Sequence, residues 1–179
     1  MMSQVKTYIE TNQQRLLDEL FDLLRIPSVS ANPDFHDDVF EAAQYLAERL
    51  SEAGLDEVEI CPTDGYPIVY GQKIIDPSLP TVLVYGHYDV QPVDPLELWT
   101  SDPFEPVLRD GKIYARGATD NKSGVLAFTK AAKAFMAVRG ELPVNSFWLS
   151  GTGRTPAASP DLSEPLVDAR LRAPWLRQD

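Results

Sequence analysis

The stretch "TVLVYGHYDV", residues 81–90, decides the fold and raises the functional question. Its first six residues are apolar over the length of a strand, which predicts a central strand covered on both faces of a sheet. His87 follows at the end of this run, and Asp89 comes two residues later. An imidazole and a carboxylate are both costly to desolvate, so their place beside a buried strand indicates a shared partner such as a metal ion.

The position of His87 favours a ligand site, because open α/β sheets bind ligands beyond the carboxyl ends of their strands. If the chain stays extended, the side chains of His87 and Asp89 point to the same side. Asp89 would then accept the second ring N–H of a metal-bound histidine, which orients the ring. The alternative is a buried histidine that is satisfied by a nearby carboxylate, and these two residues alone do not decide between them.

A second polar element, "ARGATDNKSG", covers residues 115–124 and places Asp120 directly before a helical pattern. The carboxylate therefore lies at a strand-to-helix junction. Helix capping is an alternative role, because Asp, Asn and Ser are the commonest N-cap residues, and Asn121 or Ser123 would serve equally well. Taken alone, this stretch is explained better by capping than by metal binding.

The rest of the chain alternates helical and strand-like patterns, which predicts an α/β layered sheet. Helices are expected where apolar residues recur at helical spacing, and strands where short runs alternate or are apolar throughout. The Asp110-Gly111 pair predicts a hairpin turn. The expected helices are 4–25, 36–53 and 121–138; the expected strands are 56–61, 67–74 and 144–150, and the expected hairpin is 107–115.

Composition narrows the classes of function. The 179 residues are 44% hydrophobic and 24% charged, as in one soluble globular domain. A net charge of −11 argues against a nucleic-acid partner, which needs clustered Lys and Arg. No segment resembles a signal peptide or a membrane span, so we expect a cytoplasmic protein with no membrane partner. Cys61 is the only cysteine, which excludes an internal disulfide and a cysteine-based metal site.

The chain changes character near residue 150. Residues 151–179 contain four Arg, four Pro and no Lys, whereas residues 1–150 contain six Arg and six Lys. This segment shows no clear helical or strand period. We therefore expect residues 1–150 to form the folded unit and residues 151–179 to be disordered or to derive from an out-of-frame reading.

Several stretches resemble the co-catalytic zinc metallopeptidase family of carnosine-type dipeptidases, acetylornithine deacetylase, succinyl-diaminopimelate desuccinylase and carboxypeptidase G. The resemblance covers roughly residues 4–149 in order and spacing, and is nearest to the dipeptidase branch between residues 82 and 122. It implies the N-terminal part of a three-layer α/β/α catalytic domain, with helices on both faces of a mixed sheet. The matching stretches are "LLRIPSVS" (23–30), "YGHYDVQPVD" (85–94), Trp99 and "DPFEPVLRDGKIYARGATDNK" (102–122).

The resemblance also implies roles for individual residues. His87 matches the histidine ligand of one zinc ion, Asp120 the carboxylate that bridges two zinc ions, and Asp89 the catalytic aspartate that holds the histidine. It implies a cis peptide bond between Asp120 and Asn121. Two such divalent ions polarise the scissile carbonyl and lower the pKa of a bridging water.

Part of the family's site is not matched. The family has a glutamate pair after the strand that matches "VNSFWLS", one residue acting as general base and the other as a zinc ligand. Here that position reads "GTGRTPAASPDL", and the next glutamate is Glu164. The other histidine, His36, is expected to be solvated rather than coordinating.

The expected function is therefore that of a metal-dependent hydrolase, a dipeptidase, that is truncated and inactive as this chain. The alternatives are an N-acyl amino acid deacylase of the same family or a catalytically dead fragment. Full-length relatives are expected to be homodimers whose dimerisation domain has no counterpart in this sequence.

Overall fold

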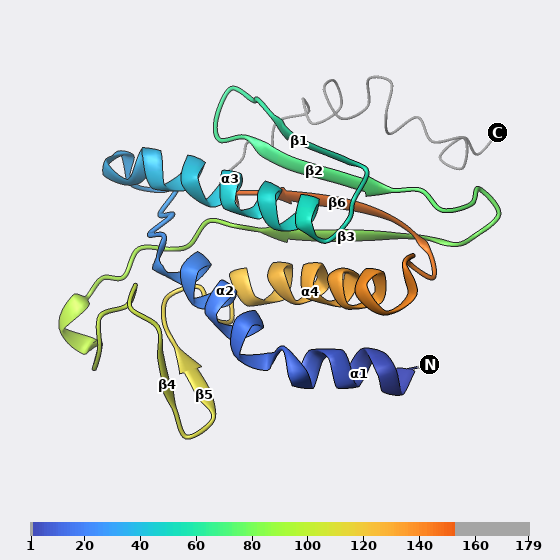
Figure 1. Cartoon of the computed structure of the whole chain (residues 1–179). Helices are drawn as coiled ribbons and strands as arrows, with labels where there is room; N and C mark the ends of the chain where they lie inside the picture. Colours follow the sequence, from blue (N-terminus) through green and yellow to red (C-terminus); the bar gives the residue numbers. More distant parts are fainter. Residues whose placement is uncertain (1, 153–179) are drawn as a thin grey trace.

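A computed structural model describes residues 2–152 (Figure 1). Four strands form the main sheet in the order β1-β2-β6-β3. Strands β1 and β2, and β2 and β6, are antiparallel, whereas β3 and β6 are parallel. This mixed sheet, together with four helices, confirms the predicted α/β class. The strands are β1 (Glu57–Cys61), β2 (Ile68–Lys73), β3 (Thr81–His87) and β6 (Asn145–Gly151).

Strand β3 lies at an edge of the sheet among the described residues, with β6 as its one neighbour. Its face is open at Leu83 and Tyr85, which are 56% and 71% exposed, whereas Val84 is buried. The prediction of a central strand covered on both faces is therefore wrong for residues 2–152. A continuous apolar run identifies a strand but does not state how many neighbours the strand has.

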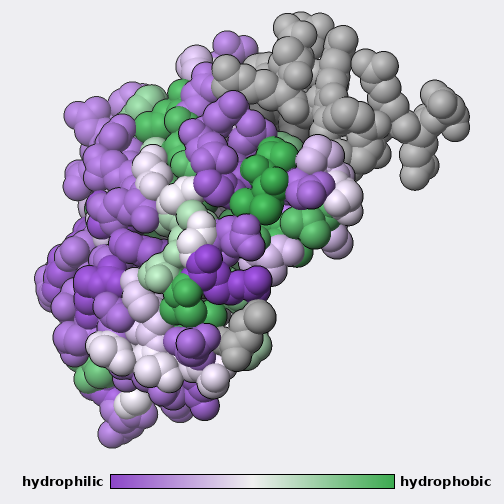
Figure 2. Space-filling model, turned by 45° about the vertical axis from the view of Figure 1, so that its right-hand side comes forward, coloured by the Kyte–Doolittle hydropathy of each residue, from purple (hydrophilic) through white to green (hydrophobic). Residues whose placement is uncertain are grey.

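Figure 2 shows apolar residues gathered in broken strips within a largely hydrophilic face of the molecule.

The four helices lie on one side of the sheet, and α3 and α4 are the two that pack on its strands (Figure 1). Helix α3 contacts β1 and β2, helix α4 runs along β3, and helices α1 and α2 pack against α4. One core cluster joins α2, α3 and α4 to the sheet through residues such as Leu46, Val69, Val125 and Trp148. The second helical layer of the expected α/β/α arrangement is therefore not formed by residues 2–152. The helices are α1 (Met2–Thr11), α2 (Gln13–Arg25), α3 (His36–Glu52) and α4 (Lys122–Arg139).

The predicted helix 4–25 is divided at Asn12 into α1 and α2. The side-chain amide of Asn12 donates to the carbonyl of Tyr8 at 2.8 Å, and its backbone departs from helical geometry with ψ at 12°. Asparagine side chains compete for backbone groups in this way, which favours an interruption. Apolar spacing alone could not reveal the break, because the period continues on both sides of it.

The predicted hairpin is confirmed and extends from the main sheet as a separate pair of strands (Figure 1). Strands β4 (Val107–Arg109) and β5 (Lys112–Tyr114) pair antiparallel. Asp110 and Gly111 both have positive φ, 50° and 72°, as a two-residue hairpin turn requires. The short helices η1 (Pro33–Phe35) and η2 (Leu96–Leu98) complete the described elements.

Two further expectations concern the limits of the fold. The predicted tail 151–179 lies outside the described residues, apart from Gly151, which ends β6, and Thr152. Among the helices of residues 2–152, none combines the length and the apolar character needed to cross a bilayer.

Candidate metal centre

His87 is the last residue of β3, and the strand places it beside the beginning of α4. Gly86 makes this close approach possible. A Cβ atom built on Gly86 would lie 2.3 Å from Cγ2 of Val125 and 2.8 Å from Oδ1 of Asn121, so a larger residue does not fit. The strand end and the helix start therefore meet without a side chain between them.

The structure brings all three predicted site residues together. Nε2 of His87 lies 2.9 Å from Oδ1 of Asp120, and Nδ1 lies 3.0 Å from Oδ1 of Asp89. The imidazole is thus held between two carboxylates from different segments. The Asp120 side chain is 78% exposed, the His87 side chain 26% and the Asp89 side chain 3%. The site therefore has an open side at Asp120 and a buried side at Asp89.

The two carboxylates change the ionisation of His87. The hydrogen bond to Asp89 is the main cause that raises the pKa of His87 to about 9; burial opposes this effect and the hydrogen bond to Asp120 adds to it. The imidazolium therefore dominates at neutral pH, with both ring N–H groups donating to carboxylates.

Asp89 is fixed by contacts from a distant segment. The hydroxyl of Ser30 donates a hydrogen bond to Oδ2 of Asp89. The backbone on either side is also held, because the amide of Tyr88 donates to Gly151 at 3.0 Å and the amide of Val90 donates to Ser28 at 2.9 Å. Ser30 was not among the predicted site residues, although it belongs to the "LLRIPSVS" stretch.

Asp120 does not cap helix α4. The N-cap position is Asn121, and no side-chain hydrogen bond caps the helix there. The Asp120 carboxylate instead faces His87. The geometry therefore disfavours the capping interpretation. The peptide bond between Asp120 and Asn121 is cis, as the resemblance implied.

Lys122 follows Asn121, and its sequence context gave no indication of a role near the site. Its side chain is fully buried, and Nζ donates to the carbonyls of Leu23 at 3.0 Å and Ile26 at 2.6 Å. Leu23 lies in the last turn of α2 and Ile26 is the C-cap residue that follows it, where backbone acceptors lack partners within the helix. Burial lowers the pKa of Lys122 to about 7. This contact ties the beginning of α4 to the segment that carries Ser30.

The facing pair of His87 and Asp120 suits one divalent ion. Imidazole nitrogen and carboxylate oxygen are ordinary zinc ligands, and two ligands of a tetrahedral zinc lie roughly 3.4 Å apart. The observed distance of 2.9 Å between Nε2 of His87 and Oδ1 of Asp120 is that of a hydrogen bond. For an ion to take the place of the proton, the two atoms must move apart by roughly 0.5 Å. The exposed side of Asp120 leaves an entry path. Among residues 2–152, no group of three or more His, Cys, Asp or Glu side chains is arranged to hold one metal ion, so these residues supply only part of a complete site.

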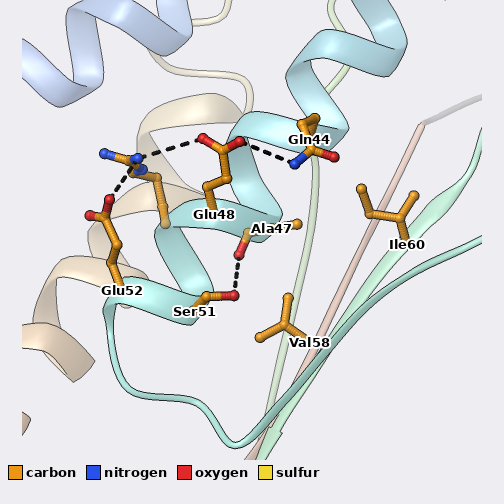
Figure 3. A pocket seen from close by; sticks show the side chains of 8 residues that line it. Gln44, Ala47, Glu48, Ser51, Glu52, Val58 and Ile60 are labelled. Atoms are coloured by element: carbon orange, nitrogen blue, oxygen red, sulfur yellow. Dashed lines mark hydrogen bonds and ion pairs between the residues drawn. The ribbon is translucent and has the colours of Figure 1, made fainter.

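The other notable features lie apart from this pair. His36 is exposed and its ring lies 4.9 Å from that of Phe40, which agrees with the expected solvated role. An open hollow of about 510 Å³ lies between α3 and β1, where Arg49 pairs with Glu48 and Glu52 (Figure 3). Neither feature includes a predicted site residue.

Comparisons with known proteins agree with the fold. Residues 83–151 match the description "Peptidase family M20/M25/M40". The Beta-Ala-His dipeptidase of Homo sapiens is 36% identical over 157 residues, which is 81% of this chain and 31% of that protein. The Cys-Gly metallodipeptidase DUG1 of Saccharomyces cerevisiae is 30% identical over 151 residues, 76% of this chain and 31% of that protein.

A solved structure has a similar fold. The crystal structure of human carnosine dipeptidase 1 superimposes with a TM-score of 0.78 at 34% identity, covering 84% of this chain and 34% of that one. The chain thus spans about a third of the length of the relatives that it matches.

Proposed function

Because this chain belongs over residues 83–151 to peptidase family M20/M25/M40, we propose that it carries part of the metal centre of a dipeptidase-like hydrolase. His87 and Asp120 are the proposed metal ligands, and Asp89 is the residue that orients His87. The observation that supports this proposal most strongly is the contact of Nε2 of His87 with Oδ1 of Asp120 across 33 positions of sequence. The metal is proposed to be zinc, with a second ion in the complete site.

The chain's own residues have distinct tasks in this proposal. Asp89 accepts a hydrogen bond from Nδ1–H of His87, which leaves Nε2 as the ligating atom. Asp120 offers a carboxylate oxygen on the exposed side. A bound divalent ion supplies Lewis acidity, which polarises a peptide carbonyl and acidifies water. Because His87 is protonated below about pH 9, ion uptake must release its Nε2 proton, so affinity increases with pH across the neutral range.

The proposed substrates are dipeptides, in line with the dipeptidases that the chain resembles. An N-acyl amino acid is the alternative substrate class, because the same site chemistry would act on its amide bond. We propose that these 179 residues alone bind an ion weakly and do not turn over. The general-base glutamate of the family has no counterpart directly after β6, where the sequence reads Gly151-Thr152. Cytoplasmic location and the domain boundary at residue 150 stay predictions.

A zinc titration by calorimetry, coupled to a dipeptide-hydrolysis assay, tests the proposal. The wild type should bind one ion, His87→Ala and Asp120→Ala should lose that binding, and His36→Ala should retain it as a matched control. Equal binding by the wild type and His87→Ala contradicts the ligand assignment. Hydrolysis by the wild type that is lost in His87→Ala contradicts only the expected inactivity.

A further inference from the structure

We propose that Ser30 is a positioning residue of the metal centre, whose hydroxyl holds the Asp89 carboxylate in the orientation that keeps Oδ1 on Nδ1 of His87. This inference rests on the proposed function, since it concerns how tightly His87 binds a metal ion. Ser30 acts through Asp89 and His87 and does not itself face the ion.

The two oxygens of the Asp89 carboxylate have different partners. Oδ1 accepts from His87 at 3.0 Å, and Oδ2 accepts from the Ser30 hydroxyl. With only 3% of the side chain exposed, water cannot readily replace either donor. Hydrogen bonds to an ionised carboxylate are about twice as strong as neutral ones, so both contribute to its orientation.

The Ser30 hydroxyl is delivered by a segment with a fixed backbone. The hydroxyl of Ser28 donates to the carbonyl of Tyr88 at 2.7 Å, and the amide of Val90 donates to the carbonyl of Ser28 at 2.9 Å. On the other side, Lys122 holds the carbonyl of Ile26 at 2.6 Å. The loop between α2 and η1 is thus held by residues from both halves of the site, and Ser30 lies within it.

Loss of the hydroxyl should loosen the carboxylate. The terminal torsion of aspartate is broad, so the plane of the carboxylate depends on the hydrogen bonds that its two oxygens accept. When Oδ2 loses the Ser30 donor, one of these bonds is gone and Oδ1 spends less time on His87. The ring then loses part of its orientation toward the ion. Changes to the direct partner of a metal-bound histidine typically weaken metal affinity by about 10- to 100-fold, and Ser30 acts one contact further out, so the lower end of this range is expected.

Two pairs of variants isolate the hydroxyl. Ser30→Ala removes it and Ser30→Thr keeps it; Ser30→Val removes it again at the size of threonine. Ser30 is only half-buried, so the added methyl group can be accommodated. If Ser30→Ala does not fold, the Thr and Val variants make the same comparison. Ser78→Ala is the matched control, because it removes an exposed serine hydroxyl that donates to the carboxylate of Asp76, away from His87 and Asp89.

The measurement is Co²⁺ titration by absorption, with urea denaturation of each metal-free variant and ¹⁵N spectra of the histidine rings. We expect Ser30→Ala and Ser30→Val to bind Co²⁺ about 10-fold more weakly, Ser30→Thr to match the wild type, and Ser78→Ala to keep its affinity. The Nδ1–H signal of His87 should weaken in Ala and Val only. Unchanged affinity in Ser30→Ala, or no rescue by Thr over Val, overturns the inference while the proposed function stands. Absence of Co²⁺ binding at His87 in the wild type overturns both.

Discussion

Replacement of Gly86 by alanine should separate β3 from α4 at the point where the site is assembled. The added Cβ would lie 2.3 Å from Cγ2 of Val125 and 2.8 Å from Oδ1 of Asn121. Carbon atoms in contact prefer about 3.5–4.0 Å, so Val125 and the first turn of α4 must move by roughly 1 Å or more. That movement displaces Asp120, which directly precedes this turn, from His87.

The expected cost follows from the packing. Overfilled cores lose about 1–3 kcal/mol, and Gly86→Ala should reach the upper end because Val125 is buried and its helix is held by the core. A loss of about 3 kcal/mol lowers the melting temperature of a domain of this size by roughly 6–12 °C. Urea denaturation followed by circular dichroism measures the difference.

Gly124→Ala is the matched control, because this glycine lies within α4. Its added Cβ would meet the Asn121 side chain at 3.5 Å, which is ordinary contact. Alanine is favoured over glycine in a helix interior by up to about 1 kcal/mol, so this variant should be as stable as the wild type or more stable. If Gly86→Ala is as stable as Gly124→Ala, the close approach of β3 and α4 is wrong.

Two other predictions concern buried charge and pH. Lys122→Met should lower the free energy of unfolding by about 1–3 kcal/mol in urea denaturation, because the carbonyl of Leu23 loses this donor and that of Ile26 keeps only the amide of Ser28. Lys112→Met on the exposed hairpin should have little effect, and equal stability of the two variants would refute the structural role. The folded-state pKa of His87 is raised to about 9, so the stabilisation from its charged form is complete below about pH 6.5 and is lost as pH increases through 9. Solvent screening reduces this contribution to about 1–2 kcal/mol, which should appear as a pH-dependent difference between the metal-free wild type and His87→Ala; a difference that stays constant from pH 6 to 10 contradicts the shift.

The features that the sequence predicted correctly are those with local causes. The Asp110-Gly111 turn needs positive φ at both positions, which these residue types tolerate, and the hairpin formed as expected. The pairing of His87 with Asp89 follows from the side-chain alternation of a strand. Their meeting with Asp120 was implied by the family resemblance, since no local pattern relates residues 33 positions apart.

The features that the sequence did not predict depend on tertiary contacts or on competition within the backbone. Leu83 and Tyr85 belong to a run predicted to be covered on both faces, and their exposure depends on whether another segment packs on that face of β3, which no local pattern reveals. Lys122 has the residue type least expected to be fully buried, and its partners are backbone carbonyls about 100 positions earlier. The contact between Ser30 and Asp89 is of the same kind, because a serine in a loop gives no indication of its distant acceptor.

The proposed function requires that His87 and Asp120 together bind a divalent ion. Ring ¹⁵N spectroscopy of histidine-labelled protein observes this binding at His87 itself. The chain has two histidines, so His36 serves as an internal reference in the same sample. On addition of Zn²⁺ near pH 7.5, we expect that Nε2 of His87 loses its proton and that its signal shifts, that His36 does not change, and that Asp120→Ala abolishes the response. Equal responses of both rings, or a full response of His87 in Asp120→Ala, would contradict it.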